Sequence, residues 1–247
     1  MLFRNKAILR LDAVDSTNNY AANLLKLTAL PEGTVITAQY QVQGRGQRGN
    51  VWESVSGLNA LFSVILYPRF LKAENHFALS QIISLALREV LEEMIQQEVY
   101  IKWPNDIICK DKKIAGILLE TAWNGGIAQN TIAGIGVNVN QGSFLCPNAA
   151  SIKMLTGKER DIDDVINFTV NAIEALYQKI YSGFFGDLKE NYRKSLYRLD
   201  ESCQFALPDG TRFVGKMKGV DEDGRLVIVD ETNSEGVFGL KEVSFIW

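Results

Sequence analysis

The stretch Gln41-Val42-Gln43-Gly44-Arg45-Gly46-Gln47-Arg48-Gly49-Asn50-Val51-Trp52 lies between two apolar segments, residues 34–38 and 60–66, that are typical of β-strands. Three glycines and two arginines fall within six consecutive positions of it. A glycine-rich backbone can turn its N–H groups toward an anion, and arginine offers forked donors that suit phosphate or carboxylate. The stretch therefore predicts a ligand site in the loop between two strands.

The spacing Gly44-x-Gly46-x-x-Gly49 also matches the dinucleotide-binding fingerprint, which requires a helix directly after the glycines. Residues 50–57 show no helical apolar period and end in a glycine, so we reject that interpretation. A solvated hairpin loop is the simpler alternative, because Gly, Arg, Gln and Asn are ordinary loop residues. Trp52 and the clustered positive charge favour the ligand site.

Composition excludes several classes of protein. The chain has 247 residues, of which 47% are apolar and 22% charged, and its net charge is −3. These values indicate a soluble globular protein and argue against a general nucleic-acid binder, whose affinity comes mainly from neutralising phosphates. Cys109, Cys146 and Cys203 are far apart and odd in number, which favours neither a zinc site nor a disulfide framework and suggests a cytoplasmic protein.

Secretion, membrane spanning and hydrolytic catalysis are all disfavoured. No apolar run approaches the roughly 20 residues that a membrane helix needs, and the N-terminus lacks the apolar core of a signal peptide. His76 is the only histidine, so a Ser-His-Asp or Cys-His arrangement is improbable.

Polar residues precede a short predicted helix ahead of the loop. Asp15-Ser16-Thr17-Asn18 are of the types that cap helices, and apolar residues follow from Tyr20. One of these side chains is expected to cap the helix. The others then remain free to bond a polar ligand.

Beyond the loop, helical and strand patterns alternate. Apolar residues recur at helical spacing from His76 to Gln97. A strand stops at Pro104 and turns through Asn105 and Asp106; residues 107–120 form a hairpin with Lys113 near its connection. The next strand, residues 131–140, contains two interior glycines, which suggest close approach by a ligand or another backbone.

The C-terminal part of the chain has a different texture. Helices are predicted over residues 163–180 and 184–196, after a loop that begins at residue 143. From Leu199 onward, five short β-like runs alternate with turns such as Pro208-Asp209-Gly210. This pattern predicts a small β-barrel.

Five motifs in order resemble the biotin protein ligases: residues 15–18 (DSTN), 41–52, 102–106 (KWPND), 113–117 (KIAGI) and 134–138 (GIGVN). Each motif alone is weak, but the ordered set is specific and spans most of residues 1–140. The resemblance implies an α+β fold, with a mixed β-sheet and flanking helices like those of class II synthetases in a catalytic domain over residues 1–198. The tail, residues 199–247, looks like the family's SH3-like C-terminal domain. Because the chain starts directly in the ligase core, we expect no DNA-binding domain.

The resemblance implies that ATP converts biotin to biotinyl-5′-adenylate, which then acylates a lysine of a biotin carboxyl carrier domain, as in acetyl-CoA carboxylase. The carboxylate of biotin is already ionised at pH 7, so the first step needs positive charge rather than a general base. Arg45, Arg48, Lys113 and Mg²⁺ would supply this charge. Asp106 would lie near the metal or the incoming lysine, although it could instead cap the turn after Pro104.

The matching motifs also imply two sets of binding residues. The biotin site would comprise Ser16, Thr17, Asn18, Gln41, Gly44, Arg45, Gly46, Gln47, Trp52, Lys113, Gly116, Gly134 and Gly136. The ATP site would comprise Arg45, Gln47, Arg48, Trp52, Asn105, Lys113 and Asn138. The chain departs from the family at Gln47, where many relatives have arginine.

Two alternatives remain open. A lipoate–protein ligase resembles this family in fold and also uses an acyl-adenylate, and a non-catalytic biotin-sensing module would need only the binding residues. The charges of Arg45, Arg48 and Lys113 favour catalysis over binding alone. The expected partner is the carrier domain, with neither DNA nor membrane, and the chain could be a monomer or a homodimer.

Overall fold

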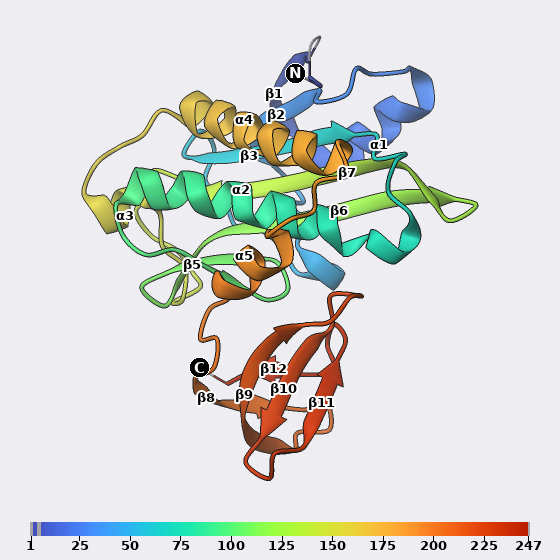
Figure 1. The fold of residues 1–247 in the computed structure, drawn as a ribbon. Helices are drawn as coiled ribbons and strands as arrows, with labels where there is room; N and C mark the ends of the chain where they lie inside the picture. The colour runs from blue at the N-terminus through green and yellow to red at the C-terminus, as the bar shows by residue number, and fades with distance from the viewer. Residues whose placement is uncertain (1, 4–5, 247) are drawn as a thin grey trace.

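The structure is a computed structural model that describes residues 2–3 and 6–246, with the side chain of Arg48 outside the described part (Figure 1). Its described residues form a seven-stranded sheet in the order β1-β2-β3-β7-β6-β5-β4 and a five-stranded sheet in the order β11-β10-β9-β8-β12. In Figure 1 the smaller sheet lies to one side of the larger one, below its β4–β5 end. The predicted mixed sheet with flanking helices and a small C-terminal β unit is confirmed.

The larger sheet combines parallel and antiparallel strands. Its members are β1 (Ile8–Val14), β2 (Val35–Gln41), β3 (Asn59–Leu66), β4 (Tyr100–Lys102), β5 (Asp106–Cys109), β6 (Lys112–Asn124) and β7 (Ile127–Asn138). β1 pairs with β2 in parallel, and every other neighbouring pair in this sheet is antiparallel. β3 lies between β2 and β7 and is buried along its whole length, including its polar residues Asn59 and Ser63.

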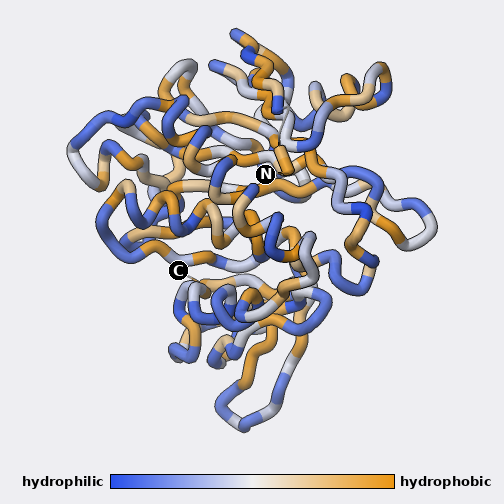
Figure 2. Tube along the Cα trace, turned by 45° about the horizontal axis from the view of Figure 1, so that its top comes forward, coloured by the Kyte–Doolittle hydropathy of each residue, from blue (hydrophilic) through white to orange (hydrophobic). Residues whose placement is uncertain are grey.

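Two long helices cover one face of this sheet. α2 (Phe77–Ile95) and α4 (Ile162–Tyr181) pack side by side across the strands (Figure 1). α2 presents Leu79, Ile82 and Ile83 to the core, and burying each of them stabilises the fold by roughly 1.5–3 kcal/mol. Figure 2 shows apolar residues gathered in the strands and helices, with hydrophilic residues in the peripheral loops.

The opposite face of the sheet is covered only in part, by α1 (Thr17–Leu27). A small cluster of Ala21, Ile36, Ile65 and Ile132 packs beneath this helix. Side chains alternate between faces along a strand, and Ala133, Ile135 and Val137 of β7 belong to the large core under α2 and α4. Gly134 and Gly136 therefore lie on the α1 face, where the sheet has room for a site.

Two helical segments differ from the sequence prediction. A short helix, α3 (Ile152–Thr156), lies in the segment expected to be loop, and the side chain of Ser151 caps it by accepting from Met154 N at 3.1 Å. The helix expected over residues 184–196 is shorter, α5 (Leu188–Lys194). Gly183 has φ +77°, a left-handed conformation that favours glycine and ends α4.

The smaller sheet is antiparallel throughout. It consists of β8 (Ser202–Ala206), β9 (Arg212–Val220), β10 (Leu226–Asp230), β11 (Glu235–Phe238) and β12 (Ser244–Phe245). Phe205 packs against both Phe213 and Phe245, with ring centroids 5.5 and 4.8 Å apart. The expected division of the chain between residues 198 and 199 stays a prediction.

The two sheets meet at the turn before β10. Trp103 Nε1 donates to the carbonyl oxygen of Gly224 at 2.9 Å, a buried bond between the sheets. Gly224 has φ +76°, and a Cβ there would lie 2.2 Å from the Phe77 ring. Glycine is thus required at this contact on two counts. No helix among residues 2–3 and 6–246 is long and apolar enough to cross a membrane.

Candidate active site

A cavity of about 420 Å³ lies on the α1 face of the larger sheet, a volume within the usual range for small-molecule sites. Its walls come from the start of α1, the glycine loop, β6, β7, the turn between β4 and β5, and the edge of the smaller sheet. Most of the residues predicted for the site line it: Ser16, Thr17, Asn18, Gln41, Arg45, Gly46, Gln47, Trp52, Asn105, Asp106, Lys113, Gly116, Gly134 and Gly136.

Two of the predicted residues that the structure describes do not line the cavity. Gly44 is a buried residue of the glycine loop, and Asn138, the last residue of β7, is buried with its Nδ2 donating to Ala150 O at 3.0 Å. The prediction for Arg48 concerns a side chain outside the described part of the protein. The role of each predicted residue stays a prediction.

One end of the cavity is a hydrogen-bonded cluster of neutral side chains and one glutamate. We call it the amide end and define it by Thr17, Asn18, Gln41, Ser63 and Glu120. Gln41 Oε1 accepts from Thr17 N at 2.7 Å and from Thr17 Oγ1 at 3.2 Å. Ser63 Oγ lies 2.8 Å from Thr17 Oγ1 and 2.7 Å from Asn18 Oδ1.

We expected a side chain of residues 15–18 to cap α1, but the structure shows a different cap. The N-cap residue is Ser16, but its side chain makes no capping bond. Gln41, at the end of β2, accepts from the first helical N–H instead. The cap therefore comes from a neighbouring strand, and Thr17 and Asn18 turn inward with only 3% and 2% of their surface exposed.

Asn18 occupies the space above a glycine of β7. A Cβ added at Gly134 would lie 2.3 Å from Asn18 Oδ1, so a larger residue there would displace this side chain. On its other side, Asn18 Nδ2 donates to Glu120 Oε2 at 2.7 Å. The interior glycine thus allows close approach by a side chain of the amide end.

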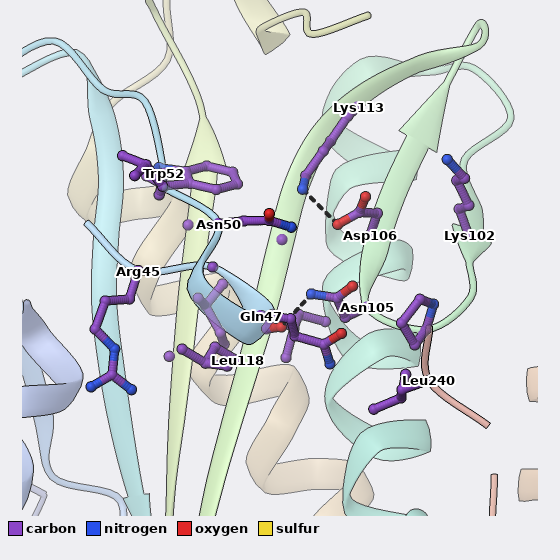
Figure 3. A pocket seen from close by; sticks show the side chains of 18 of the residues that line it. Arg45, Gln47, Asn50, Trp52, Lys102, Asn105, Asp106, Lys113, Leu118 and Leu240 are labelled. Atoms are coloured by element: carbon purple, nitrogen blue, oxygen red, sulfur yellow. Dashed lines mark hydrogen bonds and ion pairs between the residues drawn. The ribbon is translucent and has the colours of Figure 1, made fainter. Parts of the chain in front are cut away.

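Arg45 points toward the amide end. Its guanidinium donates to Asn19 Oδ1 and to Glu120 Oε1, and Figure 3 shows it directed away from Lys113. The charge that we expected beside a phosphate is paired with a carboxylate about 38% exposed. Arg45 therefore holds the loop against β6 in this arrangement.

The other end of the cavity contains most of its unpaired buried atoms. We call it the lysine end and define it by Trp52, Lys102, Asp106 and Lys113. Lys113 Nζ lies 2.6 Å from Asp106 Oδ1 and 5.4 Å from the centre of the Trp52 ring (Figure 3). The ring covers β6 and β7 closely, because a Cβ at Gly136 or Gly116 would lie 2.6 or 2.9 Å from it.

Buried polar atoms at and beside the lysine end have no hydrogen-bond partner among the described residues. They are Trp52 Nε1, Asp106 Oδ1 and, behind β6, Asn138 Oδ1. Asp106 Oδ1 is nevertheless paired in charge with Lys113 Nζ, 2.6 Å away. Buried polar atoms normally find partners, so the Trp52 indole N–H at the cavity suits a polar ligand.

A protein-only metal cage is not formed by the described residues, which contain no group of three or more His, Cys, Asp or Glu side chains able to hold an ion. Mg²⁺ commonly binds one or two carboxylates together with substrate phosphates. Asp106, a half-buried carboxylate on the cavity wall, fits that limited role.

Lys102 belongs to the lysine end, although we did not predict it as a site residue. Lys102 on β4 is the cross-strand neighbour of Asp106 on β5. Its ammonium lies 5.9 Å from the centre of the Phe245 ring. Burial lowers the pKa of Lys102 to about 8; nearby Asp106 opposes this effect, while Lys113 and Arg198 add to it. Its place at the head of the KWPND motif was the available signal.

The smaller sheet contributes residues that carried no sequence signal. Leu226, Leu240, Lys241, Val243, Ser244 and Phe245 all line the cavity. The binding residues that we predicted all precede position 140, and the cavity wall extends beyond them. Contacts between segments so far apart in the chain cannot be read from local patterns.

Comparisons with known proteins agree with this geometry. Residues 11–138 match the biotin/lipoate A/B protein ligase family. The chain is 32% identical over 231 residues to the bifunctional ligase/repressor BirA of Bacillus subtilis (strain 168), covering 92% of this chain and 69% of that protein. It is 29% identical over 223 residues to the biotin–[acetyl-CoA-carboxylase] ligase of Paracoccus denitrificans, covering 87% and 90% respectively.

A solved structure is similar over nearly the full length. The biotin protein ligase from Aquifex aeolicus in complex with biotin and ATP has a TM-score of 0.80 and 28% sequence identity, covering 98% of this chain and 99% of that one. The family match contains all the residues that define the amide end and the lysine end. The smaller sheet lies outside the family match but inside the structural one.

Proposed function

The chain belongs to the biotin/lipoate A/B protein ligase family, and from this premise we propose that it activates biotin with ATP and joins it to a carrier lysine. A carboxylate oxygen of biotin attacks the α-phosphorus of ATP, the bond to pyrophosphate breaks, and biotinyl-5′-adenylate forms. The lysine amine of the carrier then attacks the acyl carbon and loses a proton, and AMP leaves with the bonding electron pair. ATP and biotin are thus substrates.

The observation that carries this proposal is the contrast between the two ends of one cavity. Biotin has a neutral ureido ring at one end and a carboxylate at the other. The amide end offers neutral donors and acceptors, whereas the lysine end offers ammonium groups and unpartnered polar atoms. A ligand with this polarity matches both ends at once.

The amide end suits a ring that both donates and accepts. Because Gln41 Oε1 accepts from Thr17, its Nε2 is the group left to donate to a ureido carbonyl. Because Asn18 Nδ2 donates to Glu120, its Oδ1 is the group left to accept from a ureido N–H. These amide orientations follow from the hydrogen bonds around them.

The lysine end suits the adenylation step. Two anions must approach each other, and charge develops on the α-phosphate as the pyrophosphate leaves. Lys113 lies where its ammonium can contact both the carboxylate and the phosphate, and Lys102 adds a second positive charge. Asp106 would hold Mg²⁺ that neutralises phosphate charge, and Asn105, which lines the cavity, would face the nucleotide.

The second step needs a protein partner. The printed name of the Paracoccus denitrificans relative indicates the acetyl-CoA carboxylase carrier as the acceptor class. The smaller sheet borders the cavity through Lys241, Ser244 and Phe245, so it is well situated to influence transfer. We propose that residues 1–198 form the catalytic domain and residues 199–247 the SH3-like C-terminal domain.

ATP–pyrophosphate exchange tests this function. Labelled pyrophosphate should enter ATP when biotin is present, and not when the acid is omitted or replaced by lipoate. Exchange with lipoate alone would make the chain a lipoate ligase. Biotin binding without exchange would make it a binding module. Transfer of labelled biotin to a purified carboxyl carrier domain then tests the second step.

A further inference from the structure

Glu120 connects two parts of the site that are far apart in the chain. It lies on β6, three residues beyond the KIAGI motif, and its two carboxylate oxygens contact different partners. Oε2 accepts from Asn18 Nδ2 of α1 at 2.7 Å, and Oε1 accepts from the Arg45 guanidinium of the glycine loop. One carboxylate thus bonds both a ligand-facing amide and the loop beside it.

The first contact decides which way the Asn18 amide faces. An ionised carboxylate only accepts hydrogen bonds, so it must face the NH₂ group of Asn18. The carbonyl of Leu118, 3.3 Å from Nδ2, is a second acceptor on the same side. The Asn18 Oδ1 atom is consequently held toward Ser63 and the cavity, where it can accept from a ligand N–H.

The second contact fixes the glycine loop. Arg45 and Val51 form an antiparallel bridge, and Trp52 N donates to Gly44 O at 2.9 Å, so the loop closes on itself as a small hairpin. The ion pair with Glu120 joins this hairpin to β6. Trp52 is part of the same hairpin, so the position of Arg45 also influences the ring that covers Gly116 and Gly136.

We propose that Glu120 is a positioning residue whose two oxygens couple closure of the glycine loop to the orientation of Asn18. This inference rests on the proposed function, because it assigns the Asn18 carbonyl to the ureido ring of biotin. Loss of the glutamate charge removes the ion pair with Arg45 and allows the Asn18 amide to reverse. Ligand selection and loop closure therefore depend on one side chain.

Hydrogen–deuterium exchange without ligand tests the loop contact. In Glu120→Gln, the amides of residues 43–52 should exchange about fivefold faster than in the wild type, the scale of a partly exposed ion pair. Glu159→Gln is the matched control, since it breaks a comparable pair with Lys153 far from the cavity and should leave the loop unchanged. Equal loop exchange in the wild type and Glu120→Gln would overturn the proposal.

Arg45→Gln breaks the same Arg45–Glu120 ion pair by removing the arginine charge. If the two residues act through each other, Glu120→Gln/Arg45→Gln should exchange no faster than either single variant. Multiplied effects would mean that they act independently, and the proposal would fail. Protection of α2 and α4 in each variant shows whether the core remains folded.

A biotin titration of ATP–pyrophosphate exchange tests the Asn18 contact. Glu120→Gln should raise the biotin concentration for half-maximal rate about tenfold and change the rate at saturation less than twofold, as expected when a ligand hydrogen bond is lost. A lowered saturating rate with unchanged biotin affinity would contradict the assigned role. A wild type that exchanges with no acid would instead refute the proposed function, while the loop measurement would still stand.

Discussion

The amide end and the lysine end face each other across one cavity, but they differ in how far the protein satisfies its own polar groups. At the amide end, Thr17, Asn18, Gln41 and Ser63 bond one another within 3.2 Å. At the lysine end, Trp52 Nε1 has no hydrogen-bond partner among the described residues, and two ammonium groups lie near one carboxylate.

This difference indicates a division of work. A bonded network holds donors and acceptors in fixed directions, which selects a neutral ligand by its pattern. The lysine end has more positive than negative charge and a polar atom without a partner among the described residues. An anionic ligand would balance this charge better than the protein does. The first end should therefore determine affinity for the ureido ring, and the second should determine the rate of adenylation.

The largest expected effect is at the lysine end. Lys113→Ala should lower the rate of biotin-dependent ATP–pyrophosphate exchange at saturating substrates by about 10²- to 10³-fold, the range for losing one group that stabilises transition-state charge. Lys26→Ala, on the exposed side of α1, removes the same charge away from the cavity and should have no effect. A saturating rate within twofold of the wild type would remove Lys113 from the chemistry.

The next effect concerns the amide end. Gly134→Ala places a Cβ 2.3 Å from Asn18 Oδ1, so the amide must move. We expect biotin affinity to fall by about 10- to 100-fold, as when a buried bonding pattern is disrupted, with a smaller change in the saturating rate. Gly142→Ala, where a Cβ would meet nothing within 4 Å, is the control. An unchanged half-saturation concentration would argue against the amide end as the recognition element.

The pH dependence of stability due to Lys102 shows how unfavourable it is to bury positive charge at the lysine end. Burial lowers its pKa from the ordinary 10.5 to about 8, so between those pH values the unfolded chain binds more protons than the folded one. Stability from this group therefore rises with pH across that window and is lowest below pH 8. After allowance for partial exposure, the gain is about 2 kcal/mol.

Urea unfolding from pH 7 to 10 checks this sign. The free energy of unfolding of Lys102→Met should lack the rise attributed to the lysine, so the difference between the variant and the wild type should change with pH. Parallel stability curves would show that Lys102 titrates normally. Burying positive charge at the lysine end would then destabilise the fold less than we infer from comparing the two ends.

Much of the fold could be predicted from local patterns. The apolar period over residues 76–97 predicted α2, and the period over residues 163–180 predicted α4. Burial of one helix face imposes that spacing. The five short runs after residue 199 gave the smaller sheet. α3 was missed because five residues are too short to show a period, although Ser151 and Gly157 are typical of its ends.

The candidate site was predicted less completely, for a physical reason. Its motif residues converge on one cavity, but partner choice depends on tertiary contacts: Gln41 caps a helix from another strand, and Arg45 bonds Glu120 of β6. Lys241 and Phe245 reach the cavity only because the smaller sheet docks at Trp103 and Gly224. Such long-range contacts leave no local sequence pattern.

The smallest expected effect is at Gln47, which lines the cavity and is labelled in Figure 3. A neutral amide binds a phosphate oxygen less strongly than a guanidinium does. Gln47→Arg should slow release of biotinyl-adenylate by about threefold to tenfold, which corresponds to roughly 1 kcal/mol. Measured release should be compared with Arg48→Ala. An effect of Arg48→Ala alone would assign the phosphate contact to Arg48.

The division between the two ends is tested most directly by the calorimetric affinity for biotin without ATP in Lys113→Ala and Gly134→Ala, measured beside the wild type. Lys113→Ala should bind biotin within about threefold of the wild type, because its main contribution comes as charge develops on the phosphate, whereas Gly134→Ala should lose most of its affinity. Loss of biotin binding in Lys113→Ala with normal binding in Gly134→Ala would contradict the account.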